Sequence, residues 1–192
     1  FAEGAATTVA VITDDAGNSS AESNAVTFTI DTEAPNDSST QIVINDITDD
    51  NTINKAESEG QVAITGQVTG EFTAGDAVTV LVNGETYETT VNAGGTFSVD
   101  VAGSDLAQDT RVEVTVAATD AAGNLGSVTA SKDYLVDITA PSAPTVELGD
   151  GDAYISADEI TDGKVTVTVK LPADAVAGDT VNGLGDPIVL TP

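Results

Sequence analysis

Hydrophobic and polar residues alternate through the middle of the chain, in short segments separated by turns. Alternation places every second side chain on one face, which is typical of half-buried antiparallel strands. In one such segment, Val78, Val80 and Val82 share a face. The alternating segments are 42–44, 62–64, 78–82, 87–91, 97–101, 112–118 and, as one last strand, 128–130 together with 134–136. The pattern therefore predicts seven strands.

The turns between these segments support an all-β fold. Asn83-Gly84 is a strong hairpin signal, and Gly94-Gly95 marks a second turn. No segment has apolar residues at helical spacing, and Val and Thr dominate the periodic stretches. Seven short strands in a unit of about one hundred residues predict an immunoglobulin-like β-sandwich, without the Cys and Trp of true immunoglobulin domains.

A short phrase occurs twice in the chain. Residues 13–18 and 31–35 return as residues 119–124 and 137–141, and both parts are displaced by 106 positions. A period of that length is one whole domain per repeat. Weaker echoes relate 50–57 to 152–159 and 74–76 to 177–179. We therefore expect tandem domains arranged end to end: the last part of one repeat with its linker at 1–35, a complete repeat with its linker at 36–140, and the first part of a third repeat at 141–192.

Composition narrows the possible functions. The net charge is −27, from 32 acidic and 5 basic residues. Nucleic acids and anionic membrane surfaces would repel such a chain, and we expect no direct membrane insertion of this segment. His and Cys are absent, which excludes a catalytic triad and a thiol nucleophile, and aromatic residues are scarce. The composition argues against an enzyme and indicates a cation as partner.

Whether the number of strands is odd or even predicts at which end of the domain each acidic loop lies; we call this strand parity. An odd number of alternating strands places the two linkers of a domain at opposite poles. The loops 69–76 and 120–124 then share the N-terminal pole with the linker that contains Asp31, whereas the loops 48–60 and 102–110 share the C-terminal pole with the other linker. The candidate residues at the N-terminal pole are Asp31, Asp76, Asp120 and Asn124. Those at the C-terminal pole are Asp49, Asp50, Glu57, Asp105, Asp109 and Asp137.

Both poles gather carboxylates, whose mutual repulsion favours a bound counter-charge. Hard oxygen donors without imidazole or thiol select Ca²⁺ over transition metals, and Mg²⁺ prefers to keep its waters. No EF-hand loop is present. Asp and Asn next to Gly are also ordinary turn formers, so residues 120–124 could simply form a tight turn. Clustering of carboxylates nevertheless predicts calcium at both domain junctions.

The repeated phrase also resembles a known family. Thr-Asp-x-Ala-Gly-Asn, a strand and Asp-x-x-Ala-Pro, together with the stretches Gly-Thr-Phe-Ser-Val at 95–99 and Gly-Ser-Asp-Leu at 103–106, are similar to bacterial immunoglobulin-like extender repeats. Such repeats build giant RTX-type surface adhesins of Gram-negative bacteria, including biofilm and ice-binding adhesins. In that family, loop and linker carboxylates coordinate the junction calcium, which implies Asp31 and Asp137 as ligands.

The resemblance implies an extracellular, monomeric rod on the bacterial cell surface, stiffened by calcium and by neighbouring repeats of the same chain, that holds a separate adhesive domain away from the cell. The alternative is an adhesion module that itself binds a carbohydrate or protein, against which the few aromatic residues argue. The third repeat departs from the pattern, because residues 179–190 lack the long alternating strand seen after Asp76. Either that strand is shortened or the repeat belongs to a different subtype.

Overall fold

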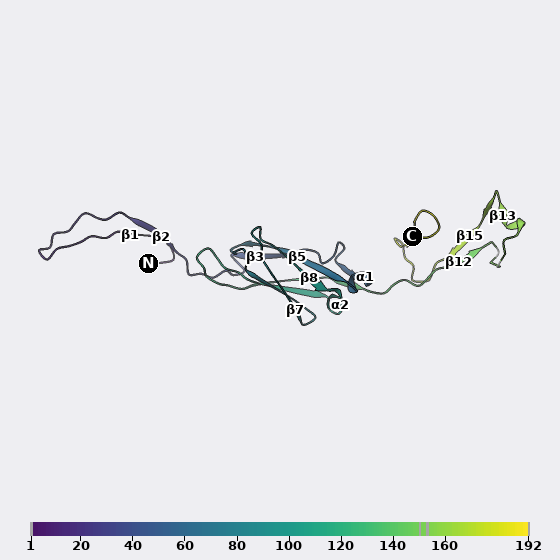
Figure 1. Ribbon diagram of the computed structural model, residues 1–192, viewed down its shortest axis with the longest axis horizontal. Coiled ribbons are helices and arrows are strands. Elements are labelled where there is room, and N and C mark those ends of the chain that lie inside the picture. The colour runs from purple at the N-terminus through teal and green to yellow at the C-terminus, as the bar shows by residue number, and fades with distance from the viewer. Residues whose placement is uncertain (1, 150, 153, 192) are drawn as a thin grey trace. The chain divides into compact units, whose positions relative to one another are not determined.

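The computed structural model describes residues 2–149, 151, 152 and 154–191. The chain divides into two compact units, Phe1–Ile138 and Thr139–Pro192. The first unit contains a hairpin followed by a β-sandwich, which we call the middle domain (Figure 1). No helix in the described residues is long and apolar enough to cross a membrane.

Two antiparallel sheets form the middle domain. One sheet has the order β3 (Thr40–Ile44), β5 (Gln61–Gly70) and β8 (Thr96–Ala102). The other has the order β10 (Val128–Asp133), β9 (Arg111–Ala117), β6 (Ala77–Val82) and β7 (Glu85–Thr90). This arrangement confirms the predicted all-β, immunoglobulin-like sandwich.

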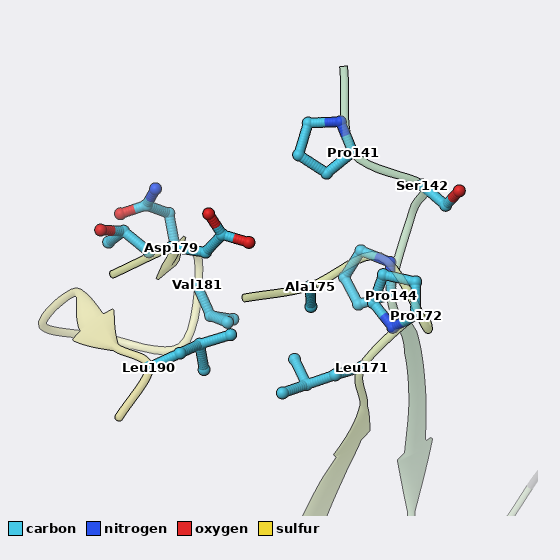
Figure 2. A pocket seen from close by; sticks show the side chains of 11 residues that line it. Pro141, Ser142, Pro144, Leu171, Pro172, Ala175, Asp179, Val181 and Leu190 are labelled. Atoms are coloured by element: carbon cyan, nitrogen blue, oxygen red, sulfur yellow. The ribbon is translucent and has the colours of Figure 1, made fainter. Parts of the chain in front are cut away.

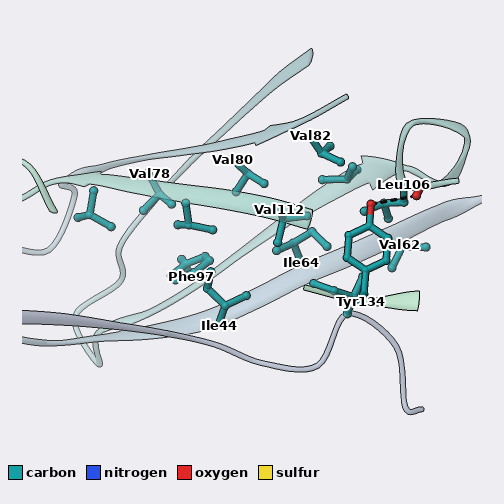
Figure 3. Packing of buried hydrophobic residues seen from close by; sticks show 14 of the residues in the cluster. Ile44, Val62, Ile64, Val78, Val80, Val82, Phe97, Leu106, Val112 and Tyr134 are labelled. Atoms are coloured by element: carbon teal, nitrogen blue, oxygen red, sulfur yellow. Dashed lines mark hydrogen bonds between the residues drawn. The ribbon is translucent and has the colours of Figure 1, made fainter. Parts of the chain in front are cut away.

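The core lies between the two sheets and consists of the residues that alternation assigned to one face. Val78, Val80 and Val82 of β6 and Ile64 of β5 are at most 1% exposed and face one another there (Figure 3). Each such side chain stabilises the fold by about 1.5–3 kcal/mol relative to an exposed one. Valine suits this position because its branched Cβ packs well on a pleated surface.

The last predicted strand is wrong in one respect, because it breaks in two. β10 ends at Asp133, and Tyr134 turns into the core, where it is 3% exposed and its hydroxyl donates to the carbonyl of Leu106 at 2.9 Å (Figure 3). The following β11 (Leu135–Asp137) leaves the sheet and pairs in parallel with β4 (Thr52–Asn54). Burial of the aromatic ring overrides the continuation of the strand.

Two single-turn helices, α1 (Lys55–Ser58) and α2 (Gly103–Leu106), were not predicted from periodicity. A capping box starts α1: Asn54 Oδ1 accepts from the Glu57 amide at 3.0 Å, and Glu57 Oε2 accepts from the Asn54 amide at 2.9 Å. This Asn-x-x-Glu spacing is a readable signal for a helix start. The two helices pack together, since a Cβ on Gly103 would lie 1.9 Å from the Glu57 carbonyl oxygen (Figure 1).

The hairpin before the middle domain pairs β1 (Gly4–Thr8) with β2 (Val26–Ile30). β1 and β2 flank residues 13–18, the first part of the repeated phrase, as β9 and β10 flank residues 119–124. An isolated bridge closes each loop, Thr13 with Ser19 and Thr119 with Leu125. The sequence repeat is thus a structural repeat.

The second unit pairs β12 (Thr145–Leu148) with β15 (Val167–Lys170) and β13 (Ile160–Thr161) with β14 (Lys164–Val165), after a 3-10 turn at Ala157–Glu159. It then forms a hairpin of β16 (Thr180–Val181) and β17 (Ile188–Val189). This hairpin follows the Ala-Gly-Asp turn, as β6 and β7 do in the middle domain, but each strand has only 2 residues. The strand is therefore shortened in this copy.

Candidate cation sites at the domain poles

The second copy of the repeated phrase folds around the carboxylate of Asp120. Asp120 Oδ1 accepts from the amides of Ala122 at 2.9 Å and Asn124 at 2.8 Å, and Oδ2 accepts from Asn124 Nδ2 at 2.9 Å. Gly123 adopts a φ of 93°, a conformation that suits glycine. The hydrogen bonds, of which that from the Asn124 side chain is the strongest influence, hold the pKa of Asp120 below its usual value. The tight turn that the sequence allowed is therefore present.

The first copy repeats this geometry. Asp14 Oδ1 accepts from the amides of Ala16 at 3.0 Å and Asn18 at 2.8 Å, and Oδ2 accepts from Asn18 Nδ2 at 3.0 Å. The pKa of Asp14 is lowered as well, chiefly by the Asn18 side chain. Residues 13–18 and 119–124 thus form the same loop structure.

The linker before the middle domain lies against the second loop. Asn124 Nδ2, besides contacting Asp120, donates to the backbone carbonyl of Asp31 at 3.1 Å. Pro35 is buried, and its carbonyl oxygen would lie 1.9 Å from a Cβ added to Gly126. The structure therefore brings Asp31, Asp120 and Asn124 together at the N-terminal pole.

Asp76 joins the same pole from the loop before β6. Its Oδ2 accepts from the amides of Thr73 at 2.7 Å and Thr119 at 2.8 Å, and Thr119 precedes Asp120. Asp76 and Asp120 are 9% and 5% exposed, and they are the buried acidic residues of the described part of the chain. No ion pair within the described residues includes either of them. Two buried carboxylates are thus compensated by N–H donors and not by a basic side chain.

Oxygen donors at this pole match the chemistry of a hard cation. Within residues 2–149, 151, 152 and 154–191, however, no three acidic side chains lie close enough to form a metal-binding group. A cation bound here would therefore need uncharged oxygens as well as carboxylates. The Asp31 carbonyl and the Asn124 amide oxygen are candidates, since both lie at the loop that holds Asp120.

At the C-terminal pole, Asp105 and Asp109 hold the β6–β7 turn. Asp105 accepts from Asn83 Nδ2 at 3.2 Å and from the Tyr87 hydroxyl, which raises the pKa of Tyr87. Asp109 accepts from the amides of Asn83 at 2.9 Å and Thr110 at 2.7 Å, and the Asn83 amide is the main cause of its lowered pKa. These two predicted residues come together on one turn.

The remaining predicted residues of this pole belong to separate local motifs. Asp50 Oδ1 accepts from the Thr52 amide at 3.0 Å, Asp49 is exposed, and Glu57 caps α1. Asp137 lies opposite Asn54 in the β4–β11 pair. The C-terminal pole is therefore more dispersed than the N-terminal pole.

Sequence reasoning missed three asparagines that organise the C-terminal pole, Asn51, Asn54 and Asn83. Asn51 and Asn83 have φ values of 56° and 51°, the left-handed region in which asparagine is enriched. For Asn83, the Asn-Gly sequence indicated the turn, although it did not indicate the contact with Asp105. Nothing comparable in the sequence pattern signalled Asn51.

The second unit repeats part of the N-terminal pole. Asp179 Oδ2 accepts from the Val176 amide at 2.9 Å, as Asp76 accepts from Thr73. Asp179 lines a hollow of about 370 Å³ whose wall is otherwise mostly apolar, with Leu171, Val181 and Leu190 among its residues (Figure 2). None of the residues that line this hollow is Lys, Arg or His.

Comparison with known proteins gives matches among solved structures. A scan of protein-family models finds no match, and neither does a search of curated proteins. A bacterial immunoglobulin-like domain from the M. primoryensis ice-binding adhesin is 50% identical over 50% of this chain and 95% of that domain, with a TM-score of 0.48. A Ca²⁺-stabilised adhesin of an Antarctic bacterium that binds ice is 39% identical over 92% of this chain, with a TM-score of 0.64.

A further structure, from a 1.5-MDa bacterial ice-binding adhesin, is 42% identical over 71% of this chain, with a TM-score of 0.53. This chain spans 42% and 43% of the two adhesin structures, respectively.

A β-sandwich with acidic loops at its poles, together with these similarities, defines the class as bacterial immunoglobulin-like domains. The chain belongs to this family, since it is 50% identical to the adhesin domain that it covers to 95%. The similar proteins are adhesin segments and not enzymes, which points to a structural role.

Proposed function

We propose that this chain is an extender segment of a calcium-dependent bacterial surface adhesin. Calcium bound at the domain junctions stiffens the segment, so that a distal adhesive domain stands away from the cell. The main support is that the Asn124 side-chain amide donates hydrogen bonds both to the linker carbonyl of Asp31 and to the carboxylate of Asp120. The likeness to a Ca²⁺-stabilised adhesin supports the choice of ion.

The linker and the loop belong to different repeats of the chain, with boundaries that we place at 35/36 and 140/141. A cation that takes oxygens from both fixes the angle at which the chain enters the sandwich. At the N-terminal pole the ligands come from Asp31, Asp76, Asp120 and Asn124. At the C-terminal pole they come from Asp49, Asp50, Glu57, Asp105, Asp109 and Asp137.

Each site needs only modest affinity. Extracellular modules bind calcium with dissociation constants of order 10⁻⁴–10⁻³ M. At about 1 mM free calcium, one such site adds roughly 0.4–1.4 kcal/mol of stability. Several sites along a chain are then enough to decide whether its hinges are stiff or mobile.

Calcium titration by calorimetry tests the proposal. Asp120→Asn and Asp137→Asn should each lower the number of bound ions, because each removes a charged oxygen from one pole. Asp100→Asn, on the exposed face of β8, changes the net charge equally and should leave the stoichiometry unchanged. Chelation should also lower the melting temperature and loosen interdomain order in X-ray scattering. Identical melting and scattering with and without chelator would refute the proposal.

A further inference from the structure

The dipeptide Asn-Gly occurs twice in the chain, at 83–84 and at 182–183, and each copy begins the loop of a hairpin. A valine precedes it in both places, and the residues of both dipeptides are exposed to water. Asparagine followed by glycine has a specific reactivity. The glycine amide nitrogen can attack the side-chain carbonyl carbon of the asparagine, because glycine has no side chain to obstruct the approach. The two hairpins control this approach differently.

The first hairpin holds Asn83 away from the reaction. Asn83 and Gly84 have φ values of 51° and 78° and form the turn between the paired ends of β6 and β7. A left-handed residue has a ψ of about +30° to +60°. At that ψ the glycine nitrogen and the asparagine Cβ lie on opposite sides of the Cα–C bond, so a ring cannot close between them.

Hydrogen bonds keep Asn83 in this conformation. Its amide donates to Asp109 Oδ2 at 2.9 Å, and its Nδ2 donates to Asp105 Oδ1 at 3.2 Å. Attack requires the reacting atoms to be aligned at about 3–3.5 Å. To reach that arrangement, Asn83 would have to give up both its turn conformation and its side-chain bond to Asp105.

The second hairpin does not restrain Asn182 in this way. Its strands have only 2 residues each, and its loop runs through residues 182–187, with Gly183 and Gly185 at φ values of 97° and 110°. Unlike Asn83, Asn182 does not adopt a left-handed backbone. In the part of the chain that the structure describes, no hydrogen bond holds its side chain. Asn182 can therefore rotate into the reactive arrangement at little cost.

We propose that Asn182 is a site of spontaneous deamidation and that the first hairpin protects Asn83 from the same reaction. The Gly183 amide nitrogen, after losing its proton to hydroxide, forms a bond to Cγ of Asn182. The Cγ–Nδ2 bond breaks, and the side-chain nitrogen takes up a proton from water and leaves as ammonia. Water then opens the resulting succinimide ring at either carbonyl and gives aspartate or isoaspartate. One water is consumed and one ammonia is released, without an oxidant or a reductant.

The reaction changes the charge and the backbone of the second unit. Asn182 and Asp179 line the same hollow, so the product places a second carboxylate in its wall. In isoaspartate the main chain runs through Cβ and Cγ, which lengthens the loop by one methylene group directly after the short strand β16. At Asn83 the same change would replace the donor to Asp105 by a like charge. Protection of Asn83 therefore also preserves the C-terminal pole.

Peptide mapping by mass spectrometry, after incubation of the whole chain at mildly alkaline pH, tests the proposal. The Asn182 peptide should acquire the mass change of NH₂ replaced by OH at least about tenfold faster than the Asn83 peptide, because Asn83 must first leave its turn and its hydrogen bond. Chromatography should resolve isoaspartate and aspartate forms of the Asn182 peptide. Chelator is present throughout, since no calcium takes part and the outcome is independent of the proposed extender function.

Incubation in urea is the matched control, because both sites have the sequence Val-Asn-Gly and lose their different hairpins there. The two rates should then converge. In the folded chain, Asp105→Ala should speed the reaction at Asn83 and leave that at Asn182 unchanged. Equal rates at the two sites of the folded wild type would overturn the proposal, and so would a difference that persists in urea.

Discussion

Gly126→Ala should release the linker from the middle domain. The added Cβ would lie 1.9 Å from the Pro35 carbonyl oxygen and 2.8 Å from its carbonyl carbon. Contacts of that length must open by more than about 1 Å, since non-bonded atoms are at their optimum near 3.5–4.0 Å. Backbone cannot rotate out of the way as a flexible side chain can, so either the sandwich or the linker has to move.

The loss of stability is set by whichever of these two movements costs less free energy. Forcing a methyl group into a packed site costs about 1–3 kcal/mol. Moving the linker instead loses the Asn124–Asp31 hydrogen bond, worth about 1 kcal/mol, together with part of the burial of Pro35. We therefore expect a loss of about 1–2 kcal/mol, which lowers the melting temperature of a domain of this size by roughly 5–10 °C.

Differential scanning calorimetry measures the stability, and the NMR chemical shift of the Asn124 side-chain amide, which donates to the Asp31 carbonyl, measures the release of the linker. Gly60→Ala is the matched control, because its added Cβ would be 3.8 Å from the Ala56 carbonyl oxygen, its nearest neighbour, which is ordinary van der Waals contact. We expect that control to stay within about 0.5 kcal/mol of the wild type. Equal melting temperatures for the two variants, with an unchanged chemical shift of the Asn124 side-chain amide, would refute the docking of the linker on Gly126.

Two further predictions concern the buried carboxylates. Asp76→Asn should cost less stability in urea unfolding than Asp76→Ala, which removes both hydrogen bonds at Oδ2 and should cost about 3 kcal/mol; equal losses would contradict the role of that oxygen as acceptor. The folded-state pKa of Asp120 is depressed from 3.8, so its stabilisation is present above that value and lost as pH falls through the lower, folded pKa. The melting temperature of the wild type should therefore fall more steeply below about pH 4 than that of Asp120→Asn, and parallel curves would show that this carboxylate does not contribute.

Alternation and turn signals predicted most of the middle domain, because the information they use is local. A strand with one buried face must alternate, and Asn83-Gly84 favours a two-residue hairpin. The strand that failed was the last one, where Tyr134 enters the core and redirects the chain. Its partner, β4, lies far away in the sequence, and short parallel pairing of that kind leaves no periodic trace.

The sequence predicted at which pole of the domain the candidate residues lie, but not which of them come together as possible ligands. Strand parity is enough to bring the linker at Asp31 to the loop at Asp120. It does not determine where each carboxylate points, which depends on local hydrogen bonds. Asp109 and Glu57 illustrate this, because one holds a hairpin turn and the other caps a helix.

Comparison of the two copies of the repeated loop distinguishes the hydrogen bonds within the loop from those that the linker adds. Around Asp14 and Asp120 the hydrogen bonds agree to within about 0.1 Å, and the pKa of both carboxyls is lowered, mainly by the asparagine four residues later. Within the described part of the chain, Asn124 also donates to a linker carbonyl, that of Asp31, and Asn18 has no such bond. Since the loop keeps its shape without that bond, the linker docks on a preformed surface and little ordering entropy is lost on docking. A weakly bound ligand can stiffen such a junction, because its binding energy is needed only to hold the linker in place and not to order the loop as well.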